Sequence, residues 1–248
     1  MRRNYFWFTF LLVLVLTVLS PDSAWAAPGG KIISTLFKSA WGKMFLGALC
    51  VVLAPYIIHV LVREHFAVRR TLKHLKRLAA VDPHFDWLKL KDRVTDCYHR
   101  VHSAWHAEDM SEASEWMTSW YWQNQQLAFL NQWERDGLVN HCRVRSIGKI
   151  RPLYLHFNQD AHGASNGSRV VISITANMED YLSERATNNI VAGKTGHRDI
   201  EHVWTLELKG GKWVVANIEE DSMTLSYVKL RSVVPAVLPA NTTGRLAV

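Results

Sequence analysis

Cysteine is scarce in this sequence, and the three cysteines follow no metal-binding or redox spacing. They are Cys50, Cys97 and Cys142, an odd number, and Cys50 lies inside a long apolar run. Such a set excludes a disulfide framework as the basis of the fold and favours a reducing compartment. The sequence also lacks a Ser-His-Asp signature, a glycine-rich phosphate loop and a paired-cysteine motif. The common hydrolase and nucleotide-binding patterns are therefore not found.

The C-terminal two thirds of the chain has no excess of positive charge, although the whole chain carries a formal charge of +7. Residues 1–62 hold five Lys or Arg and one acid, and residues 63–82 hold six against two. The other 18 basic and 19 acidic residues leave 83–248 close to neutral. A nucleic-acid-binding domain concentrates its cations on its folded part. Nucleic acid is therefore not a predicted partner.

Long apolar runs are present, and the first is typical of a secretory signal sequence. Residues 1–26 combine a basic start, an apolar stretch and a small-residue pattern that ends at Ala26. We predict cleavage after Ala26 or Ala27, with an uncleaved anchor as the open alternative because the apolar stretch is long. A mitochondrial presequence is disfavoured, because presequences are amphipathic and rich in arginine. A linker follows at 27–43.

The second apolar run, residues 44–62, is predicted to cross a membrane as a helix. It contains no charged residue, and its 19 residues span about 28 Å at ~1.5 Å per residue, close to the ~30 Å hydrocarbon core. More cations follow the run than precede it, which places the C-terminal part in the cytoplasm. The preceding cations are Lys31, Lys38 and Lys43, and the following ones are Arg63, Arg69, Arg70, Lys73, Lys76 and Arg77.

Residues 63–82 are predicted to continue this helix as a basic amphipathic segment, and its six cations are the lipid-binding candidates. Apolar residues recur among the cations at helical spacing. Two interpretations stay open. The segment can lie against anionic headgroups, where each cation contributes ~1 kcal/mol, or it is a solvated extension of the membrane helix. Pro83 disfavours helical geometry at Asp82 and ends the segment.

From residue 83 the pattern changes to that of a compact domain that starts with helices. Apolar positions at helical spacing predict a helix over 86–108 and a tryptophan-rich helix over 118–136. Between them, Asp109 with Glu112 three residues later resembles a capping box for a short helix. The domain is therefore predicted to begin with three helices.

Strand periodicity replaces helical periodicity after Gly137. The last two strands flank Gly210-Gly211, a strong hairpin signal. Helices followed by a mostly antiparallel sheet define an α+β domain over 83–232, and 233–248 is predicted to be a disordered tail. The pairs predicted to face each other across the turn are Leu208 with Trp213 and Leu206 with Val215.

Three histidines on the first predicted helix could bind a metal. His99, His102 and His106 share one side of this helix, and neutral imidazoles are common metal ligands. Successive turns of a single helix rarely converge on one ion, however, and no further ligand is apparent nearby. We therefore predict no metal, and the histidines are expected to flank the apolar stripe as polar residues.

Three carboxylates near Tyr98 could form an acid/base site. Asp96, Glu108 and Asp109 lie on or just after the same helix, and general acid–base catalysis needs a carboxylate whose pKa is tuned by burial. Carboxylates on the polar side of an amphipathic helix are usually solvated. A non-enzymatic role without a cofactor is therefore predicted, with the enzyme kept as the alternative.

Tryptophan is dense between residues 105 and 133. Five indoles exceed what an average core of this size needs, and Trp is enriched at binding surfaces. We expect some of them to line a pocket or a partner-facing groove, while the alternative that all five fill the core stays open. The pocket or partner-binding candidates are Trp105, Trp116, Trp120, Trp122 and Trp133.

The stretch 85–118 and the hairpin 204–221 resemble the Tim44-like domain family, which is named for the tether of the mitochondrial protein-import motor and includes bacterial membrane proteins. The shared features are an aromatic-started helix with a small-aromatic-acidic end, a Thr-containing second helix and a Trp-strand–Gly–Trp-strand hairpin before an acidic stretch. The resemblance covers 85–230. It implies a fold similar to nuclear transport factor two, a cone of helices packed on a curved antiparallel sheet around an apolar pocket.

The resemblance implies a non-enzymatic, inner-membrane-anchored adaptor or tether in membrane protein transport or assembly. Its cytoplasmic domain would bind anionic lipid headgroups, an unidentified membrane or cytoplasmic protein, or both. In the import tether a basic segment before the domain contacts anionic lipid, and residues 63–82 occupy a comparable place here. Two alternatives stay open: a small-molecule or lipid-binding enzyme or carrier on the same fold, and a secretion-apparatus component whose domain lies outside the cytoplasm. The oligomeric state is not indicated.

Overall fold

The computed structural model describes residues 40–160 and 163–235. The predicted signal sequence at 1–26 and residues 27–39 of the predicted linker lie outside the described residues. Most of the predicted tail does so too. The chain divides into two units, one ending at His65 and the other starting at the next residue, and each unit is described by itself.

Helix α3 (Ala40–Ala79) contains the predicted membrane helix and residues 63–79 of the predicted basic segment in one run of 40 residues. It includes one stretch that is long and apolar enough, by length and composition, to cross a membrane. The side chains of Phe45, Val51 and Val52 in this stretch are exposed. Contiguous exposed apolar side chains of this kind mark a surface that meets a membrane or another protein. Pro55 lies inside the helix.

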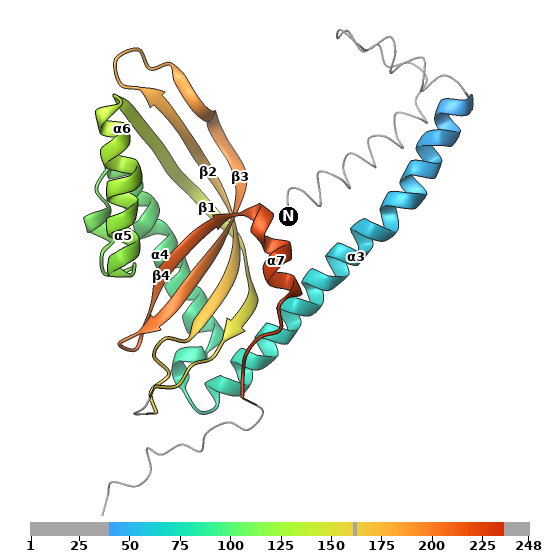
Figure 1. Cartoon of the computed structure of the whole chain (residues 1–248), viewed down its shortest axis with the longest axis horizontal. Helices are drawn as coiled ribbons and strands as arrows, with labels where there is room; N and C mark the ends of the chain where they lie inside the picture. Colours follow the sequence, from blue (N-terminus) through green and yellow to red (C-terminus); the bar gives the residue numbers. More distant parts are fainter. Residues whose placement is uncertain (1–39, 161–162, 236–248) are drawn as a thin grey trace, which may run out of the picture. The chain divides into compact units, whose positions relative to one another are not determined.

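The second unit is built on a four-stranded antiparallel sheet in which each strand pairs with the next one along the chain (Figure 1). Three register shifts along β1 mark β-bulges, which bend a strand and increase its twist. Figure 1 shows the long strands twisting along their length. The strands are β1 (Leu138–His156), β2 (Arg169–Glu184), β3 (Ile190–Lys209) and β4 (Lys212–Glu220).

The hairpin between β3 and β4 confirms the predicted turn. Gly210 and Gly211 have φ angles of +57° and +75°, the left-handed region that a two-residue mirror-image turn requires and that glycine adopts without steric cost. The predicted cross-strand pairs are both present: Leu208 faces Trp213, and Leu206 faces Val215.

The first predicted helix is also confirmed. Helix α4 (Trp87–Ala107) starts after Asp86, whose side chain accepts hydrogen bonds from the backbone N–H groups of Leu88 and Lys89, as an N-cap does. The short helix predicted after it is a 3-10 turn, η2. The remaining helices of the unit are η1 (Pro83–Phe85), η2 (Met110–Ala113), α5 (Ser119–Gln125), η3 (Gln126–Leu130), α6 (Asn131–Arg135), η4 (Asp221–Met223) and α7 (Thr224–Lys229).

The third predicted helix is a continuous helical run made of α5, η3 and α6. Its middle part, η3, is a π-helical turn. The buried residues of the run are Tyr121, Gln125 and Leu130, four and then five positions apart. The wider π turn accommodates the extra residue between the last two, so one side of the run keeps facing the core.

Helices lie on both faces of the sheet, with α4, α5 and α6 on one side and α7 on the other (Figure 1). The main core fills the first side and includes fully buried Val94, Ile172 and Trp204. A smaller cluster of Ala67, Leu153 and Val228 lies on the second side. The architecture is therefore α+β, with an antiparallel sheet, as predicted.

The C-terminal part of α3 belongs to this domain. Leu75 and Leu78 are fully buried in the main core, and the Thr71 hydroxyl donates a hydrogen bond to the Leu153 carbonyl oxygen at 3.1 Å. The folded unit thus starts at Phe66, ahead of the boundary predicted at residue 83. At the other end, Val233 pairs with His156 on β1.

Candidate functional site

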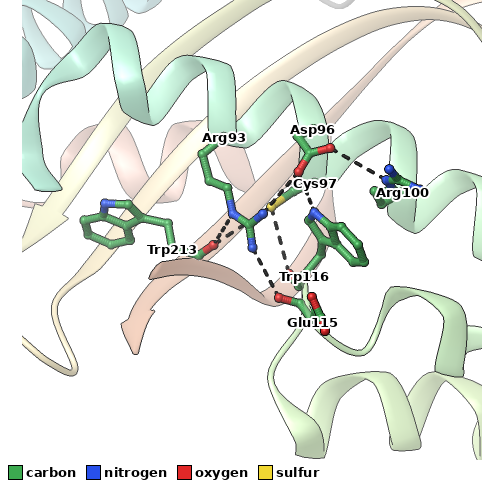
Figure 2. Close-up of polar contacts among 7 residues, drawn as sticks. All are labelled: Arg93, Asp96, Cys97, Arg100, Glu115, Trp116 and Trp213. Atoms are coloured by element: carbon green, nitrogen blue, oxygen red, sulfur yellow. Dashed lines mark hydrogen bonds and ion pairs between the residues drawn. The ribbon is translucent and has the colours of Figure 1, made fainter. Parts of the chain in front are cut away.

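Asp96, a candidate acid/base group, lies in a polar network with two arginines and an indole (Figure 2). Its carboxylate accepts hydrogen bonds from Arg93 Nη1 at 3.1 Å and from Trp116 Nε1, and it lies 3.7 Å from Arg100 Nε. The guanidinium carbons of Arg93 and Arg100 lie 5.8 and 4.9 Å from the centroid of the Trp116 ring, within cation–π range. These contacts engage the Asp96 carboxylate and fix the position of the Trp116 side chain.

Arg93 extends this network to two other segments of the chain. Its Nε donates to the carbonyl oxygen of Trp213 at 2.9 Å, and its Nη2 donates to the carbonyl oxygen of Glu115 at 3.2 Å (Figure 2). The Arg93 side chain therefore joins α4 to the start of β4 and to the segment that leads into α5. This geometry identifies Asp96 and Trp116 as parts of a structural junction.

The other two candidate carboxylates lie at the end of α4 and cap or pair locally. Glu108 Oε2 accepts a hydrogen bond from Arg185 Nη2 at 2.8 Å. Asp109 accepts one from the Ser111 backbone N–H at 2.9 Å, and hydrogen bonds from Ser111 lower the pKa of this exposed carboxyl group. Tyr98 is buried, and its hydroxyl donates to Met178 Sδ. No hydrogen bond within the described residues joins Tyr98 to the three carboxylates.

The three candidate metal-ligating histidines do not converge. His99 and His106 are exposed, whereas His102 is buried. His102 Nδ1 lies 3.0 Å from Cys142 Sγ on β1. In the described parts of the chain, no group of three or more His, Cys, Asp or Glu side chains is placed to hold a metal ion. The expectation that all three histidines only flank the apolar stripe is wrong for His102.

His102 belongs to a buried polar cluster between α4 and the sheet. Its ring lies 4.3 Å from the Tyr98 ring and 5.7 Å from the Trp204 ring, centroid to centroid. His102 Nε2, His202 Nδ1 and Trp204 Nε1 are buried, and none has a hydrogen-bond partner among the described residues. Leaving such a group unsatisfied costs about 1–3 kcal/mol, so these three nitrogens are the polar groups of the core that a water or a small polar ligand would satisfy.

Burial keeps the ionisable members of this cluster neutral. It lowers the pKa of His102 well below its usual value, with smaller contributions from His202 and His99. Burial also raises the pKa of the Cys142 thiol, reinforced by the charge of Asp180. The sequence carries no local signal for this cluster, because Cys142 and His202 come from strands distant from α4 along the chain and have no motif spacing.

The predicted tryptophans divide between the interior and one surface. Trp105 and Trp133 pack with Phe129, with ring centroids 5.5 to 6.1 Å apart. Trp122 is half-buried, and Trp120 is 70% exposed on α5. Leu127 and Phe129, on η3, are 65% and 42% exposed. The helical run therefore displays exposed apolar side chains. Trp120 was among the predicted candidates, whereas Leu127 and Phe129 were not predicted.

The predicted lipid-binding cations remain accessible on α3 with one exception. Arg63, Arg69, Lys73, Lys76 and Arg77 are exposed. Arg70 is half-buried and donates from Nη2 to the carbonyl oxygen of Leu230 at 2.8 Å. Together with burial, the charges of Arg77, Arg70 and Lys73 lower the pKa of His74, which reports the positive potential around this segment.

The apolar side of the same segment is unavailable to lipid, because it packs on the domain. Ala67, Leu75 and Leu78 are all buried. These three side chains are therefore not available to insert between lipid headgroups. The exposed cations and Phe66, which is 62% exposed, are what the segment offers to a membrane surface.

The chain belongs to the Tim44-like domain family: the family model matches residues 71–220, from the end of α3 to the end of β4. A search of curated proteins found no match. Among solved structures, the chain is similar to the crystal structure of the intermembrane space region of the chloroplast protein ARC6. That similarity has 13% sequence identity and a TM-score of 0.39, and it covers 54% of this chain and 95% of that chain.

Proposed function

We propose that the protein is a non-enzymatic, membrane-anchored adaptor or tether in membrane protein transport or assembly. The observation that carries the proposal is the composition of α3. One helix contains the candidate membrane-spanning stretch and, after it, exposed cations that alternate with residues buried in the core of the Tim44-like domain. Only residues 63–65 lie between the end of the apolar stretch and the start of the domain at Phe66.

In this proposal the apolar stretch of α3 crosses the inner membrane of a bacterium, after a signal sequence, and the domain lies in the cytoplasm. The larger number of cations after the stretch than before it supports this orientation. The exposed cations of α3 then lie beside anionic headgroups, where each contributes ~1 kcal/mol of attraction. The domain itself, a cone of helices on a curved sheet similar to nuclear transport factor two, is left to bind a partner protein.

The test of lipid binding uses a fragment that starts at Arg63 and vesicles with or without anionic lipid. Four exposed cations are replaced by Gln, and Arg70 is kept because it bonds to the domain. We expect the fragment to sediment with anionic vesicles in low salt, to detach as the Debye length shortens from ~10 Å at 0.1 M to ~3 Å at 1 M, and to bind at least tenfold more weakly after the substitutions. The replaced residues are Arg69, Lys73, Lys76 and Arg77.

A matched control removes the same charge elsewhere on the domain. Lys89, Lys91, Lys209 and Lys212 are also exposed, and replacing them by Gln should leave vesicle binding within about twofold. Equal binding to neutral vesicles, binding that salt does not weaken, or an equal loss in the control would refute lipid binding through α3.

A small-molecule carrier on the same fold is the second candidate, and the buried polar cluster favours it. Three buried nitrogens without partners, on His102, His202 and Trp204, are donors or acceptors that a bound polar molecule could satisfy. A carrier would keep a small molecule through purification in mild detergent, detectable by mass spectrometry after denaturation. His102→Leu should release it, whereas an adaptor yields no such molecule.

A further inference from the structure

The helical layer carries an exposed apolar surface within a strongly acidic part of the chain. Trp120 and Leu127 lie seven residues apart on the continuous run of α5 and η3, and Phe129 follows two residues after Leu127. We refer to these three side chains and the acidic residues of the segment 109–136 as the acidic–aromatic surface. Exposed large apolar side chains rimmed by polar residues mark interaction sites.

The charge of this region is opposite to that of the chain as a whole. Residues 109–136 contain five acids and one base, Arg135. All five carboxylates are exposed, and none forms an ion pair within the described part of the chain. Arg135 donates to Gln132. The acids are Asp109, Glu112, Glu115, Glu134 and Asp136.

Two common occupants of an apolar surface do not fit here. An anionic bilayer repels five carboxylates, so the lipid surface proposed for α3 does not suit this surface. Within the described residues, the cationic amphipathic segment that a second copy would offer is the end of α3, but Ala67, Leu75 and Leu78 on its apolar side are buried in its own domain. The local geometry also suits a protein partner, because π turns such as η3 occur frequently at functional sites.

We infer that the acidic–aromatic surface docks a cationic amphipathic helix of a partner protein. Apolar side chains of that helix cover Trp120, Leu127 and Phe129, and its Lys or Arg residues pair with the surrounding carboxylates. The inference rests on the proposed adaptor function and names the surface and the chemistry of its protein partner. Lipid and partner then bind surfaces of opposite charge, so both can bind at once.

The test uses the full chain in nanodiscs of zwitterionic phosphatidylcholine, which removes anionic lipid from the measurement. The probe is a fluorescent 18-residue amphipathic helix of Leu and Lys, and its counterpart has Glu in place of Lys. Binding to empty nanodiscs is subtracted. We expect fluorescence anisotropy to show binding of the Lys peptide that weakens with salt, and at least tenfold weaker binding of the Glu peptide.

Variants then locate the binding. Trp120→Ala with Leu127→Ala should weaken the Lys peptide at least tenfold, as loss of a central hot spot does. Glu112→Gln with Glu134→Gln should weaken it and reduce its salt dependence. Circular dichroism checks that each variant is folded.

The controls carry the same changes at exposed positions outside the surface. Leu88→Ala removes an equally exposed leucine from α4, and Asp92→Asn with Glu220→Gln removes two other exposed charges. Both should bind the Lys peptide like the unchanged protein. Equal binding of the two peptides, no binding, or insensitivity to the surface variants overturns the inference.

Sedimentation of the nanodiscs tests whether a second copy of the chain occupies the surface. If the Trp120 and Leu127 changes dissociate a dimer, a second copy occupies the surface and the inference is wrong. Failure here leaves the lipid test of α3 untouched, because that test uses other residues and no peptide. Conversely, loss of lipid binding with peptide binding retained contradicts only the lipid part of the proposed function.

Discussion

Asp96 balances two guanidinium groups and accepts an indole N–H, and that position explains why an acidic residue is needed on the middle of α4. Without the Asp96 carboxylate, the positive charges of Arg93 and Arg100 beside Trp116 would lose the negative charge that pairs with them. The side chain of Asp96 is 46% exposed, so water screens part of the interaction.

Asp96→Ala should therefore lower the free energy of unfolding by about 1–3 kcal/mol, chiefly by leaving the Trp116 N–H and Arg93 without their acceptor. Denaturant unfolding of residues 66–235 measures the change. Asp92→Ala, an exposed carboxylate on the same helix, should stay within about 0.5 kcal/mol. An Asp96→Asn protein that is folded and membrane-bound but inactive in cells would instead support the acid/base enzyme.

His102 should make the domain sensitive to acid. Its folded-state pKa is lowered by burial, so below the unfolded-state pKa of about 6.5 the unfolded chain binds a proton that the folded chain does not. The contribution to stability is present above pH 6.5 and is lost as pH falls, by up to about 1.4 kcal/mol per pH unit. Unfolding of the unchanged protein and of His102→Leu, measured between pH 7.5 and 5.5, should differ in slope by about one proton. Identical slopes would contradict a neutral buried His102.

The sequence could not place His102, for a physical reason. Periodicity assigns histidine to the polar side of a helix, and the partner that accommodates it, Cys142, lies 40 residues away on β1. Trp120 and Leu127 are the opposite case: periodicity assigns large apolar side chains to the core whether or not another element covers them, and both are exposed here.

At the scale of elements, local signals predicted turns and caps, while the junction of α3 with the domain needed the tertiary structure. The hairpin at Gly210-Gly211 and the cap at Asp109 depend on neighbouring residues only, and both were predicted from the sequence. The packing of Leu75 and Leu78 depends on a core formed by residues far along the chain. The π turn η3 likewise depends on which residues are buried.

The end of α3 should therefore stabilise the domain. Leu75→Ala removes a fully buried side chain and should cost about 2–5 kcal/mol of the free energy of unfolding of residues 66–235. Lys76→Ala changes the exposed neighbour and should cost less than about 0.5 kcal/mol. If both changes are equally mild, α3 ends as a solvated extension of the membrane helix, and the domain starts at residue 83.

At the scale of the whole molecule, charge separates the surfaces. Residues 63–82 hold six cations and two acids, whereas residues 109–136 hold five acids and one cation, so the net charge of +7 hides two segments of opposite charge. The family match covers the domain and not the apolar stretch before it. The proposed anchor and orientation therefore rest on α3 itself.

A reporter that is active only in the periplasm, fused after Val248, tests the membrane-anchored adaptor most directly. The matched fusion at Gly30, with the preceding residues intact, checks that the reporter is made and exported. We predict a silent C-terminal fusion and an active fusion at Gly30, because six cations follow the apolar stretch of α3 and three precede it. An active fusion after Val248 would contradict the cytoplasmic adaptor and support a secretion-apparatus component whose domain lies outside the cytoplasm.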